Sequence, residues 1–77
     1  MSKLPIINTA KLEIFLRLLR FTYERQKGSY VFYRHPDGCY TTIPHHPGKD
    51  LPRELLRAIL KQINLSIEEF VELIKKV

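Results

Sequence analysis

The sequence predicts an α+β fold in which helices cover one face of a three-stranded antiparallel sheet, in the order α-β-β-β-α-α. Apolar residues recur at helical spacing near both ends of the chain, whereas residues 21–44 are rich in Tyr, Phe, Thr, Val and Ile. Glycine and proline interrupt this middle segment at residues 27–29 and 35–38, where they favour turns. Because 77 residues are too few for two separate cores, we expect a single domain over residues 1–77.

The first helix is expected after Pro5, with Asn8 or Thr9 as its N-cap. Its apolar residues follow the i, i+3, i+4, i+7 spacing of an amphipathic helix that packs against other elements. These residues are Leu12, Phe15, Leu16 and Leu19.

Three strands are expected at residues 22–26, 30–34 and 39–43. Because side chains alternate along a strand, Tyr30, Phe32 and Arg34 share one face of the central strand, and Val31 and Tyr33 share the other. If the first face is open, two aromatic rings and a guanidinium form a platform for unpaired bases. If it packs on the helices, Tyr30 and Phe32 belong to the core. Both faces are apolar enough to be buried, so the choice stays open.

Two more helices are expected after the loop at residues 45–50. Pro52 suits the first turn of the earlier one, and Asn64 can close it in the left-handed conformation. The last helix is expected to begin at Ser66, with Glu69 three residues later completing a capping box. The apolar positions of the earlier helix are Leu55, Leu56, Ile59, Leu60 and Ile63.

The charge distribution favours a polyanionic partner. Thirteen Lys and Arg against eight Asp and Glu give a net charge of +5, and residues 1–34 hold seven basic and two acidic side chains. A basic half of this kind suits nucleic acid first. The single cysteine, Cys39, excludes an internal disulfide and fits a reducing, cytoplasmic location. The uncharged stretch at residues 4–10 is too short for a signal peptide or a membrane span, so we expect no membrane association.

Four segments carry a family resemblance. They are SKLP at residues 2–5, QKGSYVFYRHPDG at 26–38, PHHPGKDL at 44–51 and LRAILKQINLSIEEF at 56–70. In their order and spacing the chain resembles the HicA toxins over about residues 2–75. The resemblance implies a fold like a double-stranded-RNA-binding domain and metal-independent cleavage of mRNA without a cofactor. It also implies a partner, a HicB-like antitoxin that neutralises the toxin.

The catalytic candidates lie around the first turn. In the family a histidine follows the Gly-Ser pair of this turn, and here that position is Tyr30. Histidine suits proton transfer because its pKa lies near neutral pH, whereas a phenol with a pKa of about 10 is a poor base but can donate a hydrogen bond. His46 matches a family histidine in the later loop. Tyr30, Ser29 and His46 are therefore the candidates for the catalytic site.

The RNA-binding candidates are basic residues and the first turn itself. The turn at residues 27–29 offers an ammonium group, backbone amides and a hydroxyl that can hold a phosphate, although an ordinary polar turn has the same composition. Three basic residues at i, i+4, i+8 share a helix face that is either a phosphate-binding edge or simply solvated. The full set is Lys27, Gly28, Arg34, Lys49, Arg53, Arg57 and Lys61.

The remaining histidines are not predicted to bind metal. His45 and His46 are adjacent and point apart, and no Cys or carboxylate stands at ligand spacing, so no metal site is expected. His35 is expected to be a turn residue. Two functions stay open: an endoribonuclease, or a catalytically inactive module on the same fold that holds RNA or the antitoxin. A histidine-to-tyrosine change engineered to disarm the protein would also explain Tyr30, although alanine is the usual choice.

Overall fold

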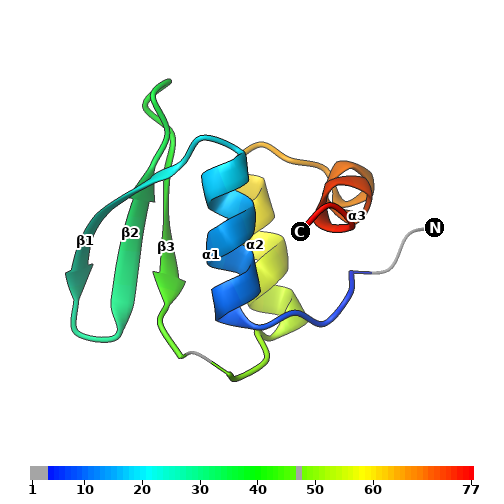
Figure 1. Cartoon of the computed structure of the whole chain (residues 1–77), viewed down its shortest axis with the longest axis horizontal. Coiled ribbons are helices and arrows are strands. Elements are labelled where there is room, and N and C mark those ends of the chain that lie inside the picture. The colour runs from blue at the N-terminus through cyan, green and yellow to red at the C-terminus, as the bar shows by residue number, and fades with distance from the viewer. Residues whose placement is uncertain (1–3, 47) are drawn as a thin grey trace.

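A three-stranded antiparallel sheet forms one side of the molecule, the first two helices lie against its other side, and the last helix lies on the far side of those two (Figure 1). The computed structural model describes residues 4–46 and 48–77. The predicted α+β class and element order are confirmed, and they are consistent with a fold like a double-stranded-RNA-binding domain. The elements are α1 (Thr9–Leu18), β1 (Thr22–Lys27), β2 (Tyr30–Arg34), β3 (Tyr40–Pro44), α2 (Arg53–Gln62) and α3 (Ile67–Ile74).

Helix α1 begins after one of the two residues predicted as its N-cap. The Asn8 side chain accepts a hydrogen bond from the Lys11 backbone N–H at 2.7 Å, so Asn8 is the N-cap and Thr9 is the first helical residue. Leu12, Phe15 and Leu16 are buried, whereas Leu19, just past the helix end, is only half-buried.

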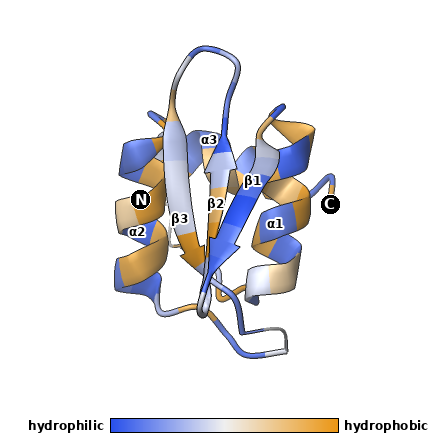
Figure 2. Ribbon diagram, turned by 90° about the vertical axis from the view of Figure 1, so that its left-hand side faces the viewer, coloured by the Kyte–Doolittle hydropathy of each residue, from blue (hydrophilic) through white to orange (hydrophobic). Residues whose placement is uncertain are grey.

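The register of the sheet decides which face of β2 is open. Val31 and Tyr33 are buried and pair with the buried Ile43 and Thr41 of β3. This face therefore packs on the helices, and the face that carries Tyr30, Phe32 and Arg34 is open. Figure 2 looks onto this open face, with α2 behind the β3 edge and α1 behind the β1 edge.

Two strand bounds differ from those predicted. β1 continues to Lys27, because Lys27 pairs with Tyr30 across a two-residue turn. β3 is shifted by one residue, because the Cys39 backbone N–H donates to the Asp37 carboxylate at 2.8 Å and so belongs to the preceding turn. Strand β1 is an edge of the sheet, and all six of its residues are exposed.

Two predicted helix caps in the second half of the chain are present in the structure. Asn64 has φ of 58°, which confirms the left-handed closure after α2. Ser66 and Glu69 form the predicted reciprocal capping box of α3. The expectation that Leu55 packs in the core is wrong, because it lies on the flank of the stripe that α2 buries and is exposed. That stripe consists of Leu56, Ile59 and Leu60, with Ile63 half-buried beside it.

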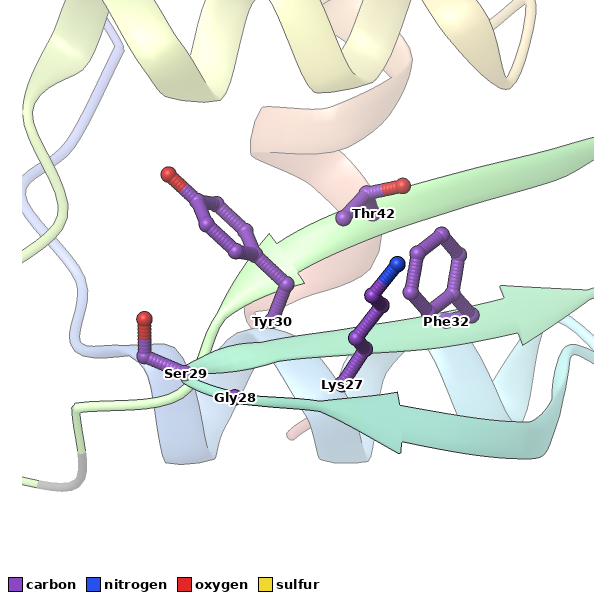
Figure 3. Close-up of a pocket in the computed structure, with 6 residues that line it drawn as sticks. All are labelled: Lys27, Gly28, Ser29, Tyr30, Phe32 and Thr42. Carbon is purple, nitrogen blue, oxygen red and sulfur yellow. The ribbon is translucent and has the colours of Figure 1, made fainter.

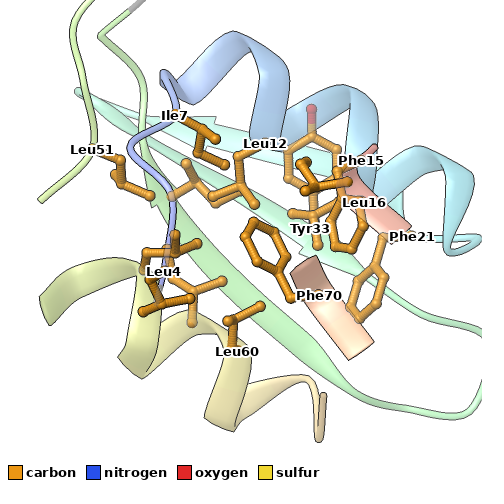
Figure 4. Packing of buried hydrophobic residues seen from close by; sticks show 14 of the residues in the cluster. Leu4, Ile7, Leu12, Phe15, Leu16, Phe21, Tyr33, Leu51, Leu60 and Phe70 are labelled. Atoms are coloured by element: carbon orange, nitrogen blue, oxygen red, sulfur yellow. The ribbon is translucent and has the colours of Figure 1, made fainter. Parts of the chain in front are cut away.

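The core joins distant parts of the chain. The rings of Phe15 in α1 and Phe70 in α3 meet edge to face with centroids 5.0 Å apart, and Leu60 of α2 lies in the same cluster (Figure 4). Near the N-terminus, the Leu51 backbone N–H donates to the Ile7 carbonyl at 2.7 Å. This bond ties the loop after β3 to the segment that enters α1. In the described part of the chain, no helix combines the length and apolar character needed to cross a membrane.

Candidate functional site

The turn between β1 and β2 is held in place by the loop that follows β3. Gly28 has φ of 59°, a left-handed conformation that favours glycine, and nothing lies within 4 Å of the position a Cβ would take. The Gln26 side chain donates to the Gly28 carbonyl at 3.1 Å. The His45 backbone N–H donates to the Ser29 carbonyl at 2.6 Å, which adds one rung beyond the end of the sheet. The turn and residue 45 therefore form one unit.

Beside this turn the open face of the sheet is hollowed. The hollow has a volume of about 570 Å³ and is lined by Lys27, Gly28, Ser29, Tyr30, Phe32 and Thr42, which we call the turn surface. Figure 3 shows the Lys27 side chain on the same side of the sheet as the rings of Tyr30 and Phe32. Tyr30 is 53% exposed. An ammonium group and two accessible aromatic rings thus share one shallow site.

Two arginines flank the open face. The Arg25 guanidinium lies 4.7 Å from the centroid of the Phe32 ring, a cation–π contact that brings a further positive charge to the turn surface. Arg34 is four residues from Tyr30 along β2, about 13 Å away at the spacing of a strand. Its Nε lies 3.2 Å from the Glu24 carboxylate, so its charge is partly neutralised. Arg34 is therefore on the predicted face but at its far end.

The other predicted basic residues lie on a second surface. Lys49 precedes α2, and Arg53, Arg57 and Lys61 lie along that helix. All four residues are exposed. The Nε of Arg53 donates to the Leu4 carbonyl at 3.0 Å, which the sequence did not indicate. Helix α2 packs beside β3, whereas Lys27 lies on β1 at the opposite edge of the sheet (Figure 2). We call this set, Lys49, Arg53, Arg57 and Lys61, the α2 surface.

The three histidines have different surroundings. His35 accepts a hydrogen bond at Nδ1 from the Asp37 backbone N–H at 3.1 Å, which confirms its role in the turn. His46 is exposed, and its carbonyl accepts from the Lys49 N–H. His45 contacts the Glu13 carboxylate of α1 with its Nδ1 at 3.1 Å. In residues 4–46 and 48–77, groups of three or more His, Cys, Asp or Glu placed to hold a metal are absent.

His45 and Glu13 are the residues that sequence reasoning missed. The same carboxylate accepts a hydrogen bond from the Tyr33 hydroxyl at 2.6 Å, so α1, β2 and the segment after β3 meet at Glu13. The sequence signals were present but indirect: Glu13 lies one residue past Leu12 in the buried stripe of α1, and Tyr33 alternates with Phe32. Only the packing of the helix on the sheet brings these groups to His45.

A comparison with protein families supports the resemblance. The family described as HicA toxin of bacterial toxin-antitoxin matches residues 10–65. This range covers more than half of the chain, from α1 through the sheet and α2, and ends before α3. No curated protein matches the sequence significantly. The chain therefore belongs to the HicA toxin family of bacterial toxin–antitoxin systems.

Proposed function

We propose that this chain is the toxin of a toxin–antitoxin pair and cleaves mRNA in the cytoplasm as a metal-independent endoribonuclease. Family membership implies a toxin–antitoxin partner. The observation that carries the proposal is the turn surface, where the Lys27 ammonium, the exposed ring of Tyr30 and the half-buried ring of Phe32 share one hollow. A cation and stacking rings in one site suit a phosphate and its unpaired base.

The two basic surfaces take different parts in this proposal. At the turn surface, Lys27 and the backbone of Gly28 hold the phosphate next to the scissile bond, and the Arg25–Phe32 contact supports a stacked base. Ser29, Tyr30 and His46 supply hydroxyl and imidazole groups around it. The α2 surface, together with Arg34, binds more distant phosphates by charge.

A HicB-like antitoxin is the proposed protein partner. It would neutralise the toxin by covering the turn surface and the exposed arginines of the α2 surface. Because both surfaces are basic, acidic side chains on the antitoxin would raise the rate of association.

Tyr30 favours one alternative function, that of a binding module that has lost catalysis. The tyrosine stands where the resemblance places a catalytic histidine, and its ring is well exposed for stacking. Such a module would still bind RNA and the antitoxin but would not cleave.

Cleavage by the purified protein tests the proposed function. We expect slow cleavage of an unstructured oligoribonucleotide in EDTA, and no cleavage of the same sequence with every 2′-hydroxyl removed, because the 2′-oxygen is the expected nucleophile. The products are separated on a denaturing gel. Binding without any cleavage of the ribo-oligonucleotide would support the binding module instead.

Salt dependence tests which basic residues contact phosphate. For a single strand, removing one phosphate contact makes the plot of log affinity against log salt concentration less steep, by about 0.7. We expect this change for Lys27→Ala and also for Arg57→Ala, measured by fluorescence anisotropy of a labelled RNA. Lys76→Ala is the matched control, because Lys76 is exposed just past the end of α3 and belongs to neither basic surface. An equal slope for all four proteins would mean that both basic surfaces are only solvated.

A further inference from the structure

Three side chains from separate elements meet behind the turn surface. Glu13 of α1 accepts the Tyr33 hydroxyl at Oε1, 2.6 Å away, and contacts His45 Nδ1 through Oε2, 3.1 Å away. The Glu13 side chain is 13% exposed and that of His45 is 38% exposed. The end of this chain of contacts at Tyr33 and Glu13 is therefore buried, and the end at His45 reaches solvent.

Tyr33 fixes the carboxylate. Its ring is fully buried in the core. Burial and, to a smaller extent, the Glu13 carboxylate raise the pKa of Tyr33 to about 12, against a smaller opposing effect of Arg17. The phenol therefore stays protonated at physiological pH and keeps donating to Oε1. This leaves Oε2 directed at His45.

The carboxylate in turn selects the form of the imidazole. An ionised carboxylate only accepts hydrogen bonds, so Nδ1 of His45 carries the proton that lies between them. In the neutral ring Nε2 then holds the lone pair, which is the arrangement of a general base oriented by a carboxylate. The backbone N–H of the same residue is bonded to the Ser29 carbonyl, so His45 lies at the end of the sheet next to the first turn. Its ring contacts Glu13 on the side of the sheet that faces the helices, and its 38% exposure lets solvent reach it at this end.

We propose that His45 is the general base of RNA cleavage in this chain, with Glu13 as its positioning residue. The inference rests on the proposed function and assigns the proton transfer for which Tyr30 is poorly suited. Nε2 of His45 takes the proton of the 2′-hydroxyl, and the 2′-oxygen forms a bond to phosphorus. The bond from phosphorus to the 5′-oxygen breaks, and that oxygen takes a proton from water. The products are a 2′,3′-cyclic phosphate and a 5′-hydroxyl, and His45 returns its proton to solvent.

Substitutions at the two histidines and at the carboxylate test this assignment. His45→Gln is expected to slow cleavage by about 100-fold or more, the usual contribution of a positioned general base. His35→Gln is the matched control, because His35 lies in the other hairpin turn and should leave the rate unchanged. Thermal unfolding of each variant checks that the fold is kept, and the exposure of His45 makes this a mild substitution.

Glu13→Gln gives a readout that a purely structural role would not. The glutamine carbonyl can still accept from Tyr33, but its amide donates to Nδ1 and so moves the imidazole proton to Nε2. We expect slower cleavage together with a change of tautomer, seen in the ¹⁵N shifts of the His45 ring.

The outcomes separate this inference from the proposed function. If the wild type cleaves and His45→Gln cleaves equally well, or if only His46→Gln loses activity, the assignment of His45 is wrong and the ribonuclease proposal stands. If the wild type does not cleave RNA at all, both fail. Unchanged ¹⁵N shifts in Glu13→Gln would overturn the role of the carboxylate even where cleavage is lost.

Discussion

Tyr30→His is expected to raise the rate of RNA cleavage by about 10²- to 10⁴-fold, the range that a positioned acid–base group contributes. The substituted position lies in the turn surface, with its side chain 53% exposed beside Lys27 and Phe32. An imidazole there would titrate near neutral pH and could protonate the leaving 5′-oxygen while His45 removes the 2′-proton. Single-turnover cleavage of an unstructured RNA in EDTA measures the effect. Growth arrest should accompany expression of the variant.

Tyr30→Phe is the matched control for this gain. It keeps the ring in the hollow and removes only the hydroxyl, so stacking is preserved. If the wild type cleaves well and Tyr30→Phe does not, the tyrosine hydroxyl is itself catalytic. If Tyr30→His gains nothing over the wild type, the site lacks more than this one group, and the binding module becomes the better account.

Phe70→Ala is expected to lower the free energy of unfolding by about 3–5 kcal/mol, the usual cost of deleting a buried aromatic side chain. Phe70 is fully buried and stacks edge to face on Phe15, so its removal would leave a cavity between α1 and α3. Such a loss is a large part of the total stability of a small domain. Urea denaturation followed by circular dichroism measures it.

Leu18→Ala provides the comparison for this core substitution. Leu18 is also a large apolar residue on a helix, but 60% of its surface is exposed, so its loss should change the unfolding free energy by no more than about 0.5 kcal/mol. Equal destabilisation by the two substitutions would mean that α3 does not contribute to the core. The comparison matters because α3 lies outside the range that the family match covers.

The sequence was sufficient to predict the helices and strands, but not to predict which face of the sheet is buried. Caps such as Ser66 with Glu69 specify a helix start by local hydrogen bonds, so they can be recognised without the fold. The central strand is apolar on both sides, and only the helices that pack on Val31 and Tyr33 distinguish the buried face from the open one. The error at Leu55 has a similar origin, because its distance from the centre of the buried stripe depends on how α2 is rotated.

The candidate site was predictable where its residues are neighbours in sequence. The residues of the first turn lie together because they are consecutive in the sequence and form a single tight turn. Glu13 and His45 are 32 residues apart, and their contact depends on how α1 packs on the sheet and on the path of the chain after β3, which no spacing rule describes. Arg53, Arg57 and Lys61 were correctly placed on one helix, but the bond from Arg53 to the Leu4 carbonyl is likewise a consequence of packing.

The contact between Phe15 and Phe70 also bears on how the protein is made in the cell. A domain whose core joins its first helix to its last cannot complete that core on the ribosome until residue 70 has been synthesised and released from the exit tunnel. Polypeptides cut short by premature termination before α3 would lack the ring that fills the space beside Phe15, and proteases act on such unfolded chains. For a member of a toxin family this arrangement ties completion of the core to translation through α3, so chains that end before α3 would lack a complete core.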